Sequence, residues 1–90
     1  MRIIQDIIIR SNRADYKIKD RICWGTQTRT ESGDIIFELE QTRNWFARDH
    51  FELKPGFKAI PESDPHEYLI TEINYSSKRP FKTILTAVRS

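Results

Sequence analysis

The residues best suited to chemistry gather in one short stretch, RNWFARDHFEL, which runs from Arg43 to Leu53. It holds three large aromatic rings, two arginines, and His50 between the acids Asp49 and Glu52. This is the densest local set of groups that could transfer a proton or bind a metal ion. Either use needs further groups from elsewhere in the chain, so the elements that position this stretch must be found first.

The chain lacks the spacings that most catalytic or metal sites require. Cys23 stands in a strand pattern beside Trp24, where a free cysteine is expected to be a small buried hydrophobe and not a nucleophile. No CxxC, HxxxH or HExxH spacing occurs, and the glycines at positions 25, 33 and 56 form no phosphate-binding motif. We therefore expect no catalytic residue, no metal and no cofactor, and predict that the protein is not an enzyme.

A small ribonuclease toxin is a further alternative. Some toxins of this length act on RNA with arginine and a polar or acidic partner, and Arg79, Arg89, Tyr75 and His66 offer such a set. The net charge of only +2 argues against this function.

Length and composition predict one small globular domain over residues 1–90. A chain of this size buries only about 60 to 65% of its unfolded surface, so each large apolar residue is assigned to the core first. Hydrophobic residues make up 38% and charged residues 31% of the chain, as in ordinary globular proteins. The longest apolar run near the start, Ile7 to Ile9, is too short for a signal peptide or a membrane helix. With a single cysteine, these features favour a cytoplasmic protein without membrane attachment.

Alternation of apolar and polar residues predicts strands along most of the chain. It is clearest in GDIIFELEQ (33–41), where Ile35, Phe37 and Leu39 share a face, and it also marks 16–24, 66–75 and 81–89, with a β-branched segment at the start. In 16–24 one face holds Tyr16, Ile18, Ile22 and Trp24, and in 66–75 one face holds Leu69, Thr71, Ile73 and Tyr75 and the other Tyr68, Ile70 and Glu72. Polar or breaker-rich segments at 25–33, 54–56, 60–67 and 76–80 predict loops and turns. The fold class is therefore all-β: a small SH3-like barrel or a strongly twisted antiparallel sheet of five to six strands, with room for one short helix.

Two structures compete for the stretch from Arg43 to Leu53. The preferred one has a strand at 45–47, a tight turn at 48–50 and a strand at 51–53. The alternative is a short helix that Asn44 caps and that stops before Pro55. Both make Phe46, Phe51 and Leu53 core residues and His50 a turn residue.

The segments YKIKDRICW, GDIIFELE, NWF and DHFEL together resemble the strand order of SH3-like small barrels over about residues 16–53. Lys19 stands where that family usually has glycine. The resemblance implies a fold and no function.

Charge is unevenly distributed, with a net +4 over 10–29, −6 over 31–72 and +4 over 74–90. Such segregation favours a charged partner or a homodimer, and tryptophan and arginine are the residues that interface hot spots prefer. We predict a protein-binding module, such as a small regulator or inhibitor of phage or mobile-element type that occludes a surface of a larger protein. A nucleic-acid-binding barrel is the alternative, since cations beside aromatic rings suit phosphates and bases. The candidate binding residues are Tyr16, Lys17, Lys19, Arg21, Trp24, Arg43, Trp45, Arg48, Lys78, Arg79 and Lys82.

Overall fold

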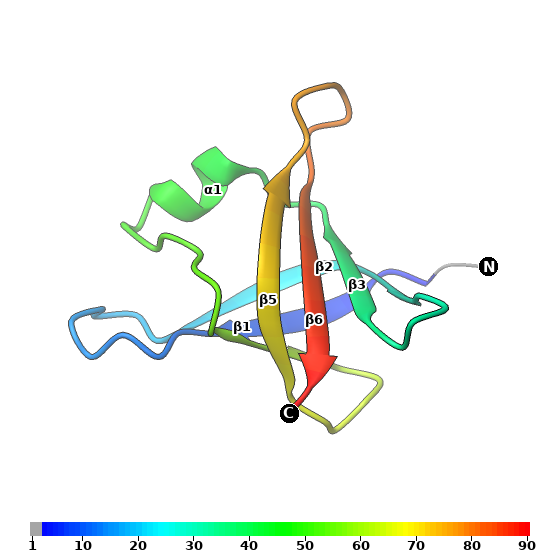
Figure 1. Ribbon diagram of the computed structural model, residues 1–90. Coiled ribbons are helices and arrows are strands. Elements are labelled where there is room, and N and C mark those ends of the chain that lie inside the picture. Colours follow the sequence, from blue (N-terminus) through cyan, green and yellow to red (C-terminus); the bar gives the residue numbers. More distant parts are fainter. Residues whose placement is uncertain (1–2) are drawn as a thin grey trace.

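The computed structural model describes residues 3–90 and shows a closed barrel of six antiparallel strands with one short helix (Figure 1). The elements are β1 (Gln5–Arg10), β2 (Asp20–Arg29), β3 (Ile35–Leu39), α1 (Arg43–Ala47), β4 (Lys58–Pro61), β5 (Tyr68–Tyr75) and β6 (Thr83–Arg89). Around the barrel the strand order is β1-β2-β3-β6-β5-β4. The all-β prediction is confirmed. The last two strands, β5 and β6, pair as an antiparallel hairpin.

The interior is filled by side chains that alternate along the strands, because a barrel strand has one inward and one outward face. Strand β3 shows this most simply, with Ile35, Phe37 and Leu39 buried as the sequence predicted. The other strands contribute Ile7, Ile9, Cys23, Ala59, Tyr68, Ile70, Leu85 and Ala87.

Strand β2 differs from the sequence-based prediction in its bounds and in its inward face. It begins at Asp20, so Tyr16 to Lys19 lie in the connection before it. It continues to Arg29, so the first five residues of the predicted loop at 25–33 are strand and only the rest is turn. Cys23 is fully buried, whereas Ile22 and Trp24 face outward. The face that carries Ile22 and Trp24, which is the apolar face in the sequence, is therefore the outer face of the barrel.

Gly25 explains why β3 can pair so closely with β2 at this position, since a Cβ atom on residue 25 would lie 2.1 Å from the carbonyl oxygen of Glu38.

Strand β5 contains a bulge between Ile70 and Glu72. Tyr68 and Ile70 are buried before the bulge, and Ile73 and Tyr75 pack against the core after it. An extra residue shifts the alternation by one position. The predicted strand is thus correct, but its two predicted faces exchange beyond Ile70.

The preferred strand-turn-strand structure for Arg43 to Leu53 is wrong, and the short helix is correct. Thr42, not Asn44, is the N-cap, and its hydroxyl accepts a hydrogen bond from the backbone N–H of Trp45. The closed barrel leaves no free strand edge with which residues 45–47 or 51–53 could pair. His50 is a turn residue as predicted, with a positive φ of 56°.

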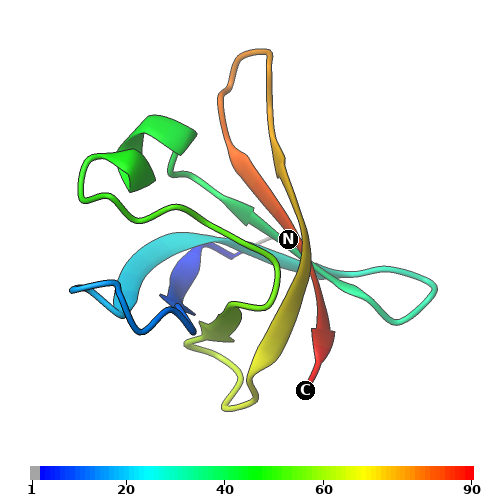
Figure 2. The same ribbon diagram turned by 60° about the vertical axis from the view of Figure 1, so that its left-hand side comes forward.

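Helix α1 and the segment after it cover one end of the barrel (Figure 2). Phe46, Phe51 and Phe57 are each about 1% exposed and pack ring against ring, with centroids 6.3 and 5.7 Å apart. Leu53 is also buried, so the three predicted core residues of the stretch from Arg43 to Leu53 are confirmed: Phe46, Phe51 and Leu53.

Strand β4 includes Ile60 and Pro61, which the sequence placed in the predicted loop at 60–67, and it completes the barrel. In residues 3–90 no helix has the length and apolar character needed to cross a membrane.

Candidate functional site

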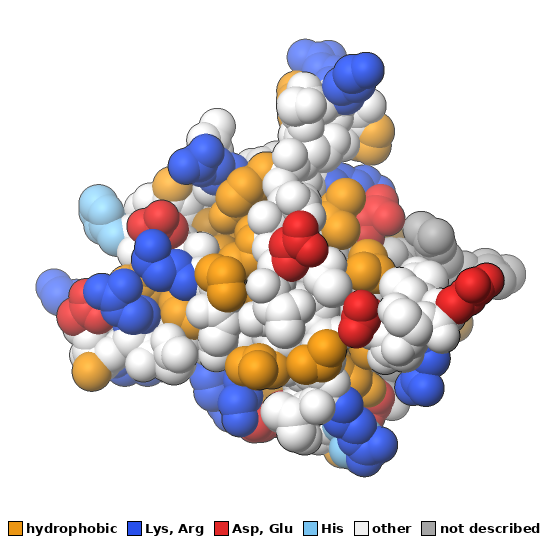
Figure 3. Space-filling view, in the orientation of Figure 1, with side chains coloured by type: hydrophobic (Ala, Val, Ile, Leu, Met, Phe, Trp, Pro, Cys, Tyr) orange, Lys and Arg blue, Asp and Glu red, His pale blue; other side chains and the backbone are white. Residues whose placement is uncertain are grey.

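The two ends of the barrel carry opposite charge. The connections at one end, 11–19, 40–57 and 76–82, hold nine basic and four acidic residues. At the other end, 30–34 and 62–67 hold five acidic residues and no lysine or arginine. Figure 3 shows basic side chains at the tip of the β5–β6 hairpin and along the side of the β1–β2 connection and α1. We call these the basic end and the acidic end. The connections at the two ends therefore differ in net charge, although Arg29 and Arg89, at the ends of β2 and β6, lie beside the acidic connections.

Nine of the eleven candidate binding residues lie in the connections of the basic end, and the other two lie on β2. Tyr16, Lys17 and Lys19 lie in the β1–β2 connection, Arg21 and Trp24 on β2, Arg43, Trp45 and Arg48 on α1 or its C-cap, and Lys78, Arg79 and Lys82 in the β5–β6 hairpin. The hairpin projects away from the barrel (Figure 1). Lys82 is held by Glu38 and Glu40, at 3.3 Å from each carboxylate, and these contacts raise its pKa.

Two tryptophans and an arginine form a cluster between β2 and α1. The Arg21 guanidinium lies 4.1 Å from the ring centroid of Trp45 and donates to the carboxylate of Asp49 at 2.5 Å. Its side chain is only 11% exposed, so it is largely committed to these contacts. Trp24 meets Trp45 edge to face at 6.2 Å and is still 44% exposed. Arg21 therefore fixes the cluster, and Trp24 presents it to solvent.

Trp24 continues an apolar row on the outer face of three strands. Ile8 of β1 is the direct partner of Ile22 on β2 and of Ile60 on β4. Side chains directly opposite one another share a face of the sheet, and Ile22 is 61% exposed. We call Ile8, Ile22, Trp24 and Ile60 the apolar strip.

A hollow of about 400 Å³ lies along the apolar strip. Its lining combines Ile8, Ile22 and Ile60 with the acidic residues Asp6 and Glu62, and also includes Asp64 and two prolines. An apolar floor with carboxylates along one side favours an apolar ligand group accompanied by positive charge.

A second hollow, of about 520 Å³, opens at the basic end between the β1–β2 connection, α1 and β5. Two arginines lie against tyrosine rings in it: Arg13 is 5.4 Å from the centroid of Tyr16, and Arg43 is 5.5 Å from that of Tyr75. His50 also lines the hollow. Burial raises the pKa of Tyr75, which keeps its hydroxyl protonated. We call Arg13, Tyr16, Arg43, His50 and Tyr75 the arginine–tyrosine pocket.

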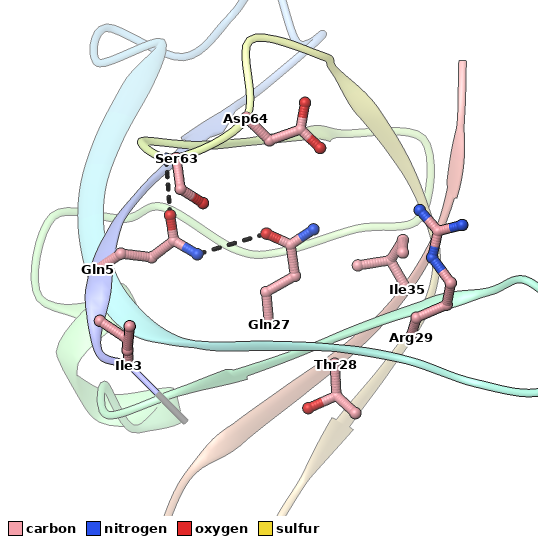
Figure 4. Close-up of a pocket in the computed structure, with 8 residues that line it drawn as sticks. All are labelled: Ile3, Gln5, Gln27, Thr28, Arg29, Ile35, Ser63 and Asp64. Carbon is pink, nitrogen blue, oxygen red and sulfur yellow. Dashed lines mark hydrogen bonds between the residues drawn. The ribbon is translucent and has the colours of Figure 1, made fainter. Parts of the chain in front are cut away.

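A third hollow, of about 670 Å³, lies toward the acidic end (Figure 4). Gln5 spans it, donating to the side-chain oxygen of Gln27 at 3.4 Å and accepting from the backbone N–H of Ser63 at 2.8 Å. These amide groups bond one another and join β1, β2 and the β4–β5 connection, which is a structural role.

His66, Arg89, Asp64 and Tyr68 form a polar cluster near the C-terminal end of β6. Asp64 accepts hydrogen bonds from the Tyr68 hydroxyl and from the His66 backbone, and these bonds, led by that of Tyr68, lower its pKa to about 2. Arg89 contacts the Nε2 atom of the His66 ring. Tyr75 lies at the opposite end of β5 and Arg79 in the hairpin beyond it, so the four residues of the ribonuclease hypothesis do not converge.

The remaining chemical candidates form no site in the described residues. Within 3–90, no group of three or more histidine, cysteine or acidic side chains is placed to hold a metal ion, Asp49, His50 and Glu52 included. Cys23 is fully buried, and burial raises its pKa to about 12, so a reactive thiolate does not form near neutral pH.

The isoleucines of the apolar strip were not among the binding residues predicted from the sequence, and neither were three members of the arginine–tyrosine pocket: Arg13, His50 and Tyr75. The run Ile7 to Ile9 was a usable signal, because consecutive apolar residues on a barrel strand must place one on the outer face. No local pattern marks the pocket, since its residues come from three separate segments.

The fold is that of a small, closed, six-stranded antiparallel barrel with one covering helix. Comparisons with family models, with curated proteins and with solved structures give no match to this chain.

Proposed function

We propose that the protein is a non-enzymatic protein-binding module that docks through the apolar strip and acts as a small regulator or inhibitor by occluding a surface of a larger protein. The observation that carries this proposal is the contiguous row of outward apolar side chains, with Ile22 61% and Trp24 44% exposed. Contiguous exposed apolar side chains, unlike single scattered ones, are typical of surfaces that bind another molecule.

The neighbouring tryptophan–arginine cluster supports the same function. Trp24 and Trp45 present large rigid rings, and Arg21 with Asp49 holds Trp45 in place. Rigid aromatic anchors bind with little loss of side-chain entropy, and they dominate many interfaces. The closed barrel of short strands also supports an SH3-like fold, in which the strands form a fixed frame for such a surface.

The chemistry of the hollow indicates the kind of partner surface. Asp6 and Glu62 lie along the apolar floor, so a complementary partner would present an apolar side chain flanked by lysine or arginine. If two copies of the chain docked through this same face, the Asp6 and Glu62 carboxylates of the two copies would lie close together and repel each other. A different protein is therefore the better partner.

Affinity capture from a lysate of the source organism, with nuclease present, tests this function with two matched variants. Ile22→Asp lies in the strip, and Ile18→Asp lies in the β1–β2 connection, where Ile18 is 42% exposed. We expect Ile22→Asp to weaken capture at least about tenfold, as for a hot-spot residue, and Ile18→Asp to leave it nearly unchanged.

Equal losses for the two variants, or capture that disappears with nuclease, would contradict the proposal. Light scattering of the purified chain adds a separate check. A dimer that Ile22→Asp dissociates would show that a second copy occupies the strip.

A further inference from the structure

We propose that the arginine–tyrosine pocket binds one nucleotide of a single-stranded nucleic acid, with Arg13 and Arg43 at the phosphate and the base stacked against the Arg43–Tyr75 pair. This site lies at the basic end, away from the hollow of the apolar strip. The inference therefore stands independently of the proposed protein-binding function.

The volume and lining of the pocket suit a nucleotide. About 520 Å³ is within the usual range for small-ligand sites, about 300 to 1,000 Å³. Its polar groups are the two guanidinium groups, the His50 ring, the Tyr75 hydroxyl and the Glu52 carboxylate, and all of these except the carboxylate can donate to an anion. Phe46 and Phe51 add apolar lining. A guanidinium plane and an aromatic ring are the two surfaces on which proteins stack nucleic-acid bases.

Arg43 supplies the most available positive charge in the pocket. In residues 3–90 the structure shows no carboxylate paired with Arg43, which rests on Tyr75. Arg13 donates two hydrogen bonds to Asp15, at 3.0 and 2.9 Å, so a phosphate must compete with that carboxylate for Arg13. Both side chains are exposed, at 42 and 63%, which leaves the pair open to such exchange. Glu52 also lines the pocket, and Lys54 partly offsets its charge with an Nζ to carboxylate distance of 3.5 Å.

Part of the pocket is already fixed before a ligand binds. The Tyr16 hydroxyl donates to the backbone carbonyl of Glu52 at 3.0 Å, which joins the β1–β2 connection to the segment after α1. Tyr16 also packs against Phe51 and Phe57, with centroids 5.6 and 6.0 Å apart. A ligand would therefore meet a wall that is held by the core.

The surroundings of the pocket favour a strand over an isolated nucleotide. Lys17, Arg48, Lys78 and Arg79 lie on the three connections of the basic end, and the structure shows no ion pair for any of them in the described part of the chain. Such cations can bind successive phosphates of a backbone. A base that enters this hollow must leave its stack, which favours single strands over duplexes.

Fluorescence anisotropy with a labelled twelve-nucleotide oligouridine tests the proposal at low salt. Arg43→Gln removes an exposed charge from the pocket, and Arg29→Gln is the matched control, because it removes an exposed arginine near the acidic end. We expect Arg43→Gln to weaken binding at least about fivefold and to lower the slope of log affinity against log salt by about one, with Arg29→Gln close to the wild type.

A second pair of variants tests stacking. Tyr75→Phe keeps the ring and should bind like the wild type, whereas Tyr75→Leu should lose at least about fivefold. Thermal melts of all four variants establish that each is folded. Absence of binding, equal loss for Arg43→Gln and Arg29→Gln, or equal affinity for a duplex of the same length would overturn the proposal. Uridine monophosphate that competes as strongly as the oligonucleotide would overturn the assignment to a strand and indicate a free nucleotide.

Discussion

Substitution of Gly25 by alanine gives the sharpest test of the barrel itself. The Cβ atom of an alanine would lie 2.1 Å from the carbonyl oxygen of Glu38 and 2.8 Å from the Cα atom of Leu39. A normal carbon-to-oxygen contact is about 3.3 Å, so the overlap is about 1.2 Å. Both atoms belong to the backbone of the paired strand β3, so no rotation of a side chain can relieve it.

The expected cost follows from this overlap. Added volume in a packed interior usually destabilises by about 1 to 3 kcal/mol, and a clash with backbone belongs at the upper limit. A loss of about 3 kcal/mol in a domain of this size lowers the melting temperature by about 12 to 24 °C. Urea unfolding followed by tryptophan fluorescence gives the free energy directly, since Trp24 adjoins Gly25 in the sequence.

Gly33→Ala is the control for this experiment. Gly33 has a φ of +92°, but no heavy atom lies within 4 Å of the position that an alanine Cβ would take. Alanine there meets backbone strain alone, about 1 to 2 kcal/mol. We expect Gly25→Ala to be the less stable of the two variants. If Gly25→Ala unfolds at the same urea concentration as Gly33→Ala or above it, the close approach of β2 and β3 at this position is refuted.

Two further predictions concern groups whose pKa is shifted. Burial raises the pKa of Cys23 to about 12, so iodoacetamide at pH 8 should leave the native protein unmodified and label the urea-unfolded chain; rapid labelling of the native protein would contradict the inward placement. The hydrogen bond from Tyr68 is the main cause that lowers the pKa of Asp64 from 3.8 to about 2, so its stabilisation is present above pH 3.8 and is lost as the pH falls toward 2. Asp64→Asn should therefore show a flatter dependence of unfolding free energy on pH in that window, and profiles of the same slope would argue against the interaction.

Several elements could be predicted because their signals are local. The alternation of Ile35, Phe37 and Leu39 is a period-two pattern that only a strand buries on one side. Turn residues such as Gly56, with a φ of +100°, likewise mark a chain reversal by their own conformational preference. The core placement of Phe46 and Phe51 was the same for the helix and for the strand alternative, because large aromatic rings are buried in either case.

The errors came from positions where long-range contacts decide. In β2 the sequence offers Ile22 and Trp24 on one face and Cys23 on the other, and hydrophobicity alone favours burial of the larger residues. Barrel closure reversed this, because the inward face needs a glycine at position 25, where β3 passes close by, and Cys23 lies on the same face as Gly25. The bulge after Ile70 is another feature that depends on pairing, here with β6.

The sequence by itself determined that this protein is small and all-β, with uneven charge, since composition and periodicity are properties of each segment. The tertiary structure alone decided which residues meet. Closure of the barrel brought nine basic residues to one end and five acidic residues to the other, and aligned Ile8, Ile22 and Ile60 across three strands. The physical reason is that a local pattern specifies a strand and its two faces, whereas neighbours and the inward face are selected by packing over the whole chain.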